Sequence, residues 1–369
     1  MLPIPPMMLT TGPVPAYPQV LAALGKPVLY DYDPAFQTFY ADVIEKLRLA
    51  LRQDTAPVIM QGEAILGIEA AAAALIARDD VVLNLVSGVY GKGFAGWAAR
   101  YGKEVIELAV PYDDIIDPQA VRDILRKRPD ITIVSLCHHD TPSGTLNPLP
   151  EIGAIVAEHG AYLIVDAVSS FGGMDAHPQA HVDIFITSPS KCLGSTPGLS
   201  LIGVSERAWV KIEANPDAPR GSFLSLLGWK GASEPGKPFP VTPSIAEIYA
   251  LDAALDLYAQ EGPENVWARH AQTADITRKG LLELGLKLWP KKLEYSAPTA
   301  TAFLPPEGFS DVALRDRLRD EHGILLSLGR ADTAGKLLRV GHMGASARPD
   351  FARATISALS QILSRPINS

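Results

Sequence analysis

Short apolar runs alternate along the chain with segments in which apolar residues recur at helical spacing. The apolar runs predict strands at residues 57–60, 81–85, 105–110, 131–136, 162–165, 184–187 and 199–204. Helical spacing follows at 93–101 and 118–128, and it also begins near residues 65 and 150. This alternation predicts an α/β fold with a mostly parallel sheet of about seven strands, flanked by helices on both faces.

The hydrophobic pattern changes after residue 240. A long helical pattern begins near Ile245 and runs to about Gln260, where it leads into a second region. We expect residues 26–260 to form a large domain and residues 261–369 a small C-terminal α+β domain. Residues 1–25 are expected at the junction of the two. A length of 369 residues suits this division better than a single small module.

Composition narrows the range of partners. The 33 Lys and Arg and 41 Asp and Glu give a net charge of −8, and no basic block is available to neutralise a run of phosphates. Two cysteines are too few for a disulfide framework, and the first residues lack the pattern of a secretory signal. The longest apolar stretch, residues 64–77, is too short to span a membrane. We therefore expect a cytoplasmic protein that binds neither nucleic acid nor membrane.

Polar residues follow several predicted strands, at the edge of the sheet where ligands of such folds bind. Asp166 ends the strand at 162–165, and Lys191 follows the strand at 184–187. An acid and an amine are therefore expected at one edge of one sheet. Taken singly, the two residues are equally compatible with a carboxylate that caps a turn and a solvated lysine.

The flanking segments carry more information. Residues 166–170 read DAVSS, residues 188–194 read SPSKCLG, residues 9–14 read LTTGPV and residues 341–344 read GHMG. In these segments the chain resembles the class V aminotransferases, which are fold type I enzymes dependent on pyridoxal phosphate. The resemblance implies that Lys191 forms the Schiff base and that Asp166 pairs with the pyridine nitrogen. A carboxylate there favours the protonated ring, which is the better electron sink.

The same resemblance implies roles for residues elsewhere in the chain. Tyr90, in a turn flanked by glycines, matches the aromatic residue that stacks on the ring, and residues 138–144 match the family's loop beside it. The residues implied in cofactor binding there are His138 and Thr141. Arg339 matches the position that binds the substrate carboxylate, for which a planar guanidinium is suited. Arg330 is a candidate second cation.

Two further implications concern partners and metals. The family assembles at least as dimers, so we expect a homodimer or homotetramer in which Thr242 reaches a neighbouring site. The two adjacent histidines, His138 and His139, do not predict a metal site, because neighbouring residues leaving a strand point to opposite faces. No metal is expected.

One position departs from the family pattern. Class V aminotransferases bind the cofactor phosphate with small polar residues after the first strand, whereas this chain has Glu63 there. Two charges about 4 Å apart interact by about 4 kcal/mol at an effective dielectric near 20, so a carboxylate repels a phosphate. A neutral hydroxymethyl group would instead donate a hydrogen bond to it. The alternative is that Glu63 turns away and interacts with a helix N-terminus.

Six segments narrow the resemblance to family members that use unphosphorylated pyridoxamine as a substrate. They lie at residues 30–37, 62–63, 87–94, 137–144, 166–174 and 341–344. The resemblance implies amino transfer from pyridoxamine to pyruvate, giving pyridoxal and L-alanine. Tyr30, Glu63, Tyr90, Asp166 and Lys191 would bind the vitamin, with pyridoxal held on Lys191 and no pyridoxal phosphate tightly bound.

Other functions remain open from the sequence. One is a conventional pyridoxal-phosphate aminotransferase of the alanine–glyoxylate or serine–pyruvate type. A second is a non-catalytic vitamin B6 binding protein, which would need Lys191 but no carboxylate-binding Arg339. A cysteine desulfurase needs a thiol on a mobile loop. Cys137, which ends a predicted strand, and Cys192, beside the lysine, do not suit that role.

Overall fold

The computed structural model describes residues 5–178 and 181–364. Its helices are α1 (Pro18–Leu24), α2 (Pro34–Leu51), α3 (Ala64–Leu75), α4 (Val89–Tyr101), α5 (Pro118–Lys127), α6 (Leu149–His159), α7 (Glu206–Ala214), α8 (Leu226–Trp229), α9 (Ile245–Glu261), α10 (Pro263–Glu283), α11 (Asp311–His322) and α12 (Pro349–Leu363), with short 3-10 turns η1 (Leu293–Tyr295), η2 (Ala331–Thr333) and η3 (Gly344–Ser346). None of the described helices is long and apolar enough to cross a membrane.

The larger sheet has seven strands in the order β2-β10-β9-β8-β5-β3-β4. These strands are β2 (Val58–Gln61), β3 (Val81–Val86), β4 (Glu104–Ala109), β5 (Ile131–Cys137), β8 (Tyr162–Asp166), β9 (Ile184–Thr187) and β10 (Leu199–Val204). All neighbours pair in parallel except β10, which is antiparallel to β2 and β9. The predicted mostly parallel sheet and its seven strands are confirmed.

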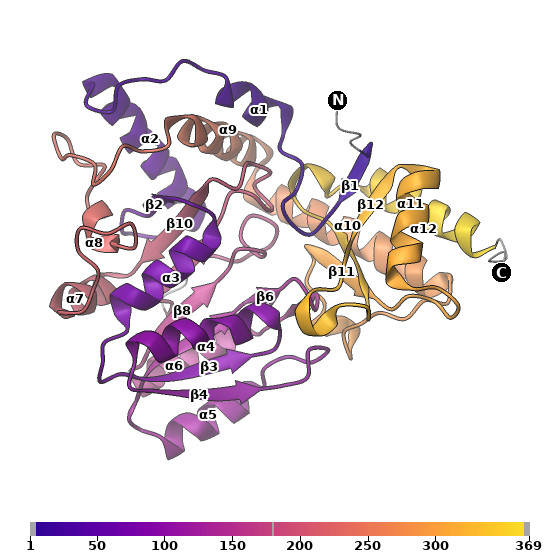
Figure 1. Ribbon diagram of the computed structural model, residues 1–369, viewed down its shortest axis with the longest axis horizontal. Coiled ribbons are helices and arrows are strands. Elements are labelled where there is room, and N and C mark those ends of the chain that lie inside the picture. Colours follow the sequence, from indigo (N-terminus) through magenta and orange to yellow (C-terminus); the bar gives the residue numbers. More distant parts are fainter. Residues whose placement is uncertain (1–4, 179–180, 365–369) are drawn as a thin grey trace.

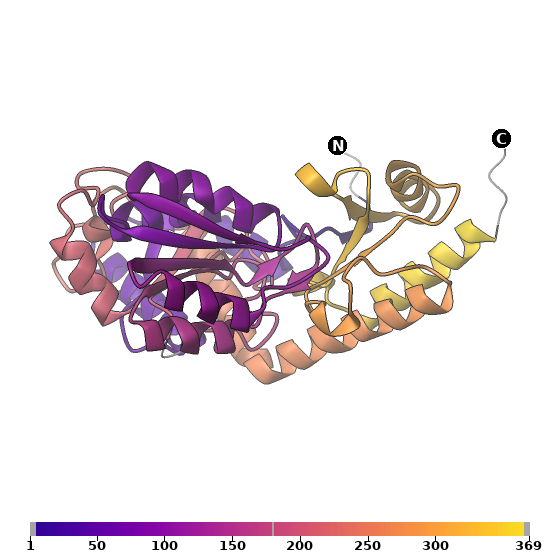
Figure 2. The ribbon, with the colours of Figure 1, turned by 90° about the horizontal axis from the view of Figure 1, so that it is seen from below.

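Helices cover both faces of this sheet (Figure 2). Helix α3 packs against α4, and α5 packs against α6. The strands between them are apolar because both faces are buried, and β3, for example, is buried along its whole length. Because β3, β4, β5, β8 and β9 run parallel, their carboxyl ends lie at the same edge of the sheet. This edge faces the C-terminal part of the chain (Figure 1).

A second sheet of four strands lies at that edge (Figure 1). Its order is β1-β12-β13-β11, with β1 (Met7–Leu9), β11 (Ala300–Phe303), β12 (Ile324–Leu328) and β13 (Leu338–Gly341). A short hairpin, β6 (His139–Asp140) and β7 (Thr145–Leu146), follows β5. The seven-stranded sheet and the four-stranded sheet each have their own hydrophobic cluster. The predicted domain boundaries after residues 25 and 260 stay a prediction.

The N-terminal segment connects the two regions. Strand β1 pairs in parallel with β12, so residues 7–9 complete the four-stranded sheet. Shortly afterwards α1 packs against α9, which belongs with the large sheet. The residues between β1 and α1 consequently cross the edge where the parallel strands end.

The predicted start of the helix at residues 93–101 is wrong. Helix α4 begins at Val89, so Tyr90 lies in its first turn and not in a glycine-flanked loop. The added turn contains Gly91, which disfavours a helix when only local preferences are considered. Its amide groups are bound by the side chain of Asp140, which is 50 residues away in sequence.

Candidate active site

A cavity of about 380 Å³ lies at the edge where the parallel strands end. It is bounded by the N-terminal segment, the start of α3 and the loops that follow β8 and β9. Five of the residues predicted from the sequence line it, namely Glu63, Tyr90, Asp166, Lys191 and Arg330. The fold therefore brings together side chains that are up to 267 positions apart in the chain.

Lys191 lies in the loop after β9 and enters the cavity beside the N-terminal segment. Its Nζ donates a hydrogen bond to the carbonyl oxygen of Thr11 at 2.5 Å. A Cβ on Gly12 would lie 2.0 Å from the same Nζ, so only glycine permits this approach. Burial and the positive charge of Arg339 lower the pKa of Lys191 to about 8. The amine is therefore partly neutral, and able to act as a nucleophile, near neutral pH.

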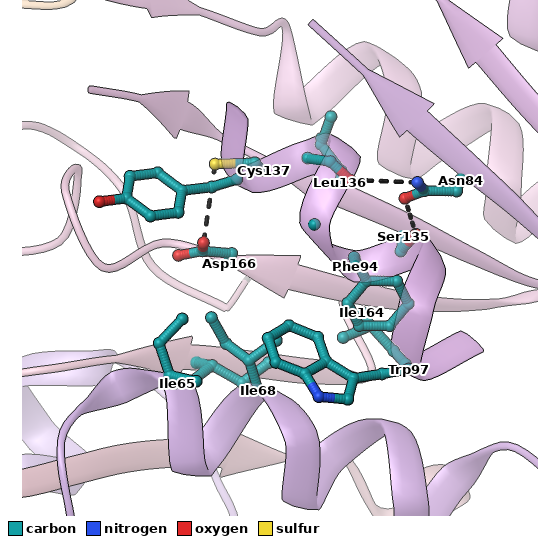
Figure 3. A pocket seen from close by; sticks show the side chains of 14 residues that line it. Ile65, Ile68, Asn84, Phe94, Trp97, Ser135, Leu136, Cys137, Ile164 and Asp166 are labelled. Atoms are coloured by element: carbon teal, nitrogen blue, oxygen red, sulfur yellow. Dashed lines mark hydrogen bonds between the residues drawn. The ribbon is translucent and has the colours of Figure 1, made fainter. Parts of the chain in front are cut away.

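Asp166 ends β8 and is held from two sides. Its Oδ1 accepts a hydrogen bond from the backbone N–H of Val168 at 3.0 Å, and its Oδ2 accepts one from the thiol of Cys137 at 3.7 Å (Figure 3). Burial raises the pKa of Asp166, while these hydrogen bonds and the charge of Lys191 oppose the rise. The sequence analysis missed the contact with Cys137, although the two residues occupy paired positions on β5 and β8.

A smaller apolar pocket of about 70 Å³ adjoins Asp166 (Figure 3). Ile65 and Ile68 of α3 and Phe94 and Trp97 of α4 form its apolar wall. These apolar side chains limit the solvation of the Asp166 carboxyl group, which is consistent with its raised pKa.

Tyr90 connects the large sheet to the second sheet. Its hydroxyl oxygen accepts a hydrogen bond from Nη1 of Arg330 at 3.2 Å, and the Arg330 guanidinium lies 5.7 Å from the centre of the tyrosine ring. Burial raises the pKa of Tyr90. The hydroxyl is therefore neutral at physiological pH, and the ring forms part of the cavity wall.

Arg339 is a buried cation on β13. Its Nε and Nη2 donate hydrogen bonds to the carbonyl oxygen of Leu328 at 3.0 and 2.6 Å. Within residues 5–178 and 181–364 it forms no ion pair. Burial lowers its pKa to about 10. Arg339 does not line the cavity itself, but its charge acts on both Tyr90 and Lys191. A buried guanidinium without a carboxylate partner is suited to binding an anion.

Glu63 occupies the N-cap position of α3 and faces the same cavity as Lys191. Its side chain makes no capping hydrogen bond, which argues against the alternative in which it turns back to the helix. The side chain is exposed, and its negative charge acts on both Lys191 and Asp166. A helix N-terminus is otherwise a favourable place for a phosphate.

Besides Arg339, four predicted residues lie outside the described lining of the cavity. His138 and Thr141 are buried, and Nδ1 of His138 lies 3.0 Å from Oγ of Ser170. Tyr30 and Thr242 are exposed on the surface of this chain. The roles that the sequence analysis gave to these four residues stay predictions.

Comparison with known proteins places this site in a family. Residues 70–357 match the family model described as aminotransferase class V. The chain belongs to the class V aminotransferases. The pyridoxamine–pyruvate transaminase of Mesorhizobium japonicum is 57% identical to it over 356 residues, which cover 96% of this chain and 91% of that protein.

Solved structures of class V aminotransferases agree with the sequence comparison. The pyridoxamine-pyruvate aminotransferase from Mesorhizobium loti has a TM-score of 0.97 at 55% identity, covering 99% of this chain and 94% of that one. The alanine–glyoxylate aminotransferase from a Nostoc species has a TM-score of 0.92 at 31% identity, covering 98% and 96%. The predicted fold type I architecture and the predicted family are confirmed.

Class V aminotransferases depend on pyridoxal phosphate, and most of this site fits the ring of that molecule. Lys191 offers an amine, Asp166 a carboxylate and Tyr90 an aromatic face around one cavity. The phosphate end fits less well, because Glu63 places a negative charge at the helix N-terminus that would otherwise attract the phosphate.

Proposed function

We propose that this class V aminotransferase transfers the amino group of pyridoxamine to pyruvate, giving pyridoxal and L-alanine, and that the reaction is reversible. The observation that carries the proposal is Glu63, an acid without a capping partner in the same cavity as Lys191. The 57% identity to the Mesorhizobium japonicum pyridoxamine–pyruvate transaminase supports it.

Glu63 selects the form of the vitamin. A phosphate at the start of α3 would place like charges close together, at a cost of about 4 kcal/mol for a separation near 4 Å and an effective dielectric near 20. A hydroxymethyl group is neutral and donates a hydrogen bond to the Glu63 carboxylate. We therefore infer that pyridoxamine and pyridoxal bind as substrates, and that pyridoxal phosphate is not tightly retained.

Lys191 and Asp166 supply the reactive groups of the chain. When bound, the B6 ring withdraws electrons from the bond being broken. The Lys191 amine, with a pKa lowered to about 8, would attack the aldehyde carbon of pyridoxal, with loss of water, and so hold the vitamin covalently. Once released, the same amine moves a proton between the two carbon atoms that exchange the amino group. Asp166 keeps the ring nitrogen protonated by opposite-charge attraction.

The two arginines bind the acceptor. Arg339 has no ion-pair partner in the described part of the chain, and a pyruvate carboxylate would provide one. Arg330 reaches the same region and is held by the Tyr90 hydroxyl. A binding protein without catalytic activity would need no such pair of cations, so these residues favour the enzyme over the binding protein.

We infer that a second copy of the chain completes the molecule, as a homodimer or homotetramer. Several large side chains are exposed on the segment after α1 and on the loop after α7, namely Val28, Leu29, Tyr30, Tyr32 and Phe223. Contact with a partner would bury them. Tyr30 and Thr242 would then act at the partner's cavity, since they do not line the cavity of their own chain.

An amino-acceptor screen tests the proposal. The purified protein is given pyridoxamine or pyridoxamine phosphate as donor, each with a panel of 2-oxo acids, and pyridoxal and amino acid are quantified. We expect pyridoxamine with pyruvate to be the best pair and L-alanine the product. Retention of pyridoxal phosphate through dialysis, together with its requirement for alanine turnover, would instead identify a conventional enzyme of the alanine–glyoxylate type.

A further inference from the structure

Asp140 is a buried acid that the proposed reaction does not use. It lies on β6 and its side chain has no exposed area. Its Oδ2 accepts hydrogen bonds from the backbone N–H groups of Tyr90 at 2.8 Å and Gly91 at 3.1 Å. Its Oδ1 is also buried and has no hydrogen-bond partner among the described residues. One oxygen is therefore stabilised as an anion, and the other lacks the partner that a buried charge requires.

The surrounding chain keeps this carboxylate against the start of α4. A Cβ on Gly88 would lie 2.2 Å from the Asp140 side chain, so the position must be glycine for steric reasons. The first turn of α4 also presents its positive dipole end to the carboxylate. Asp140 consequently fixes the turn that carries Tyr90, and it cannot move away without breaking both hydrogen bonds.

The hairpin that carries Asp140 also reaches the second sheet. A Cβ on Gly144, in the turn of this hairpin, would lie 3.0 Å from the Ala302 side chain. Ala302 is on β11 and is paired with Arg339 on β13. The negative charge of Asp140 acts on the Arg339 guanidinium and stabilises its charged form. Within the described ranges Arg339 forms no ion pair, so Asp140 is a nearby compensating charge for it.

We propose that Asp140 balances the charge of Arg339 in the free enzyme and takes up a proton when the carboxylate of the oxo acid binds there. The proposal deepens the proposed function and rests on it, since it specifies how the acceptor is recognised. A second carboxylate beside Arg339 would repel ionised Asp140 in a region with little water. Protonation removes that repulsion, and the new O–H is available to the acceptor or to a water molecule.

Several titratable and charged groups face Asp140 from the elements packed around it. They are Tyr90 on α4, Tyr112 after β4, Cys137 on β5, Asp166 on β8 and Arg339 on β13. Burial, opposed by the hydrogen bonds from Gly91 and Tyr90, raises the pKa of Asp140 to about 7. The proton can therefore be gained or lost near neutral pH.

The direction of the pH dependence follows from this value. Below pH 7 Asp140 is already protonated, and the acceptor binds without further proton uptake. Above pH 7 binding must take a proton from solvent, so the dissociation constant should rise by about fivefold between pH 7 and pH 8. A binding site that relied on Arg339 without Asp140 would show no such change.

The test uses oxamate, an unreactive carboxylate of the same shape as pyruvate, with the protein loaded with pyridoxal. Calorimetry at pH 8 in two buffers of different ionisation enthalpy gives the number of protons taken up per oxamate bound. We expect nearly one proton for the unaltered protein and close to none for Asp140→Asn, whose side-chain oxygen can still accept the Tyr90 amide. Asp113→Asn removes an acid in the segment after β4 that lines a different hollow, and it is the control, with proton uptake unchanged.

A second measurement avoids any substitution. Difference infrared spectroscopy of the unaltered protein should show a protonated, buried carboxylic acid appearing when oxamate binds at pH 8. Equal proton uptake in Asp140→Asn and the unaltered protein would overturn the proposal and point to Asp166 or Lys191 instead. Failure of oxamate to bind would show that Arg339 does not form a carboxylate site, and it would overturn the proposal. Amino transfer from pyridoxamine, assayed separately, would still report on the proposed function.

Discussion

The two sheets contribute to the site in different ways. The seven-stranded sheet presents Asp166 and Lys191 at or shortly after the ends of β8 and β9. The four-stranded sheet contributes Arg339 from within β13 and Arg330 from the segment after β12. The first pair lies where any parallel sheet concentrates its ligands, whereas the second pair depends on how the two sheets meet. This difference suggests that the reaction at the vitamin and the recognition of the acceptor can be altered separately.

The largest effect is expected at Lys191. Lys191→Ala should reduce amino transfer by about a thousandfold or more, because both the nucleophile and the proton carrier are lost. Single-turnover formation of alanine from pyridoxamine and pyruvate measures it. Lys191→Arg is the matched control: it keeps the positive charge but not a reactive amine, and it should be equally inactive. Full turnover by Lys191→Ala would rule out the Schiff base at this residue.

Arg339 should act mainly on the binding of the acceptor. Arg339→Gln should raise the KM for pyruvate by about a hundredfold, because a buried, charge-assisted pair of hydrogen bonds is lost. The extent of pyridoxal binding should hardly change. Arg330→Gln, at an exposed position, should raise the same KM by about fivefold at most. Steady-state kinetics with each substrate varied in turn gives both KM values. A pyruvate KM unchanged by Arg339→Gln would contradict the assignment of acceptor binding to the four-stranded sheet.

Gly88 tests the contact between Asp140 and α4. The backbone at Gly88 is extended, with φ of −178°, so any residue could adopt it. The clash with Asp140 should still make Gly88→Ala destabilising by about 1–3 kcal/mol. Gly93→Ala is the control, because a Cβ there meets no atom within 4 Å, and it should stabilise α4 by about 0.5–1 kcal/mol. Denaturant unfolding measures both changes, and equal stability of the two variants would contradict the contact.

The smallest expected effect is a change in pH dependence. Lys191 reacts as the neutral amine, so pyridoxal capture should accelerate as the pH rises and level off above about 8. Arg339 lowers the pKa of Lys191 through like-charge repulsion. Arg339→Gln should therefore move the midpoint to higher pH. Stopped-flow absorbance of pyridoxal binding measures the midpoint, and an unmoved midpoint would show that the two sheets are not coupled in this way.

Much of the large sheet could be predicted from the chain. The seven apolar runs are β2, β3, β4, β5, β8, β9 and β10, and the shared edge of Asp166 and Lys191 follows from their parallel order. These features depend on local patterns, because a strand buried on both faces must be apolar along its length. Helix α9 follows from another local pattern, the helical spacing of the apolar residues between 245 and 260.

Long-range features could not be predicted in this way. Helix α4 starts earlier than its local pattern indicates, because Asp140 binds amides of its first turn from 50 residues away. The sequence also did not indicate that β1 pairs with β12, which brings the carbonyl of Thr11 to Lys191. Arg339 was found through resemblance to the family and not from its surroundings. Tyr30 and Thr242 do not line the cavity of their own chain, and the roles proposed for them would need a second copy.

The most direct test of the account is a comparison of donors at Glu63. The ratio of kcat/KM for pyridoxamine to that for pyridoxamine phosphate, with saturating pyruvate, is measured in the unaltered protein, Glu63→Gln and Glu63→Ser. The account predicts a ratio well above one that falls by about tenfold or more in both variants, since both remove the charge that repels phosphate. An unchanged ratio in both variants would contradict the selection of unphosphorylated vitamin by Glu63.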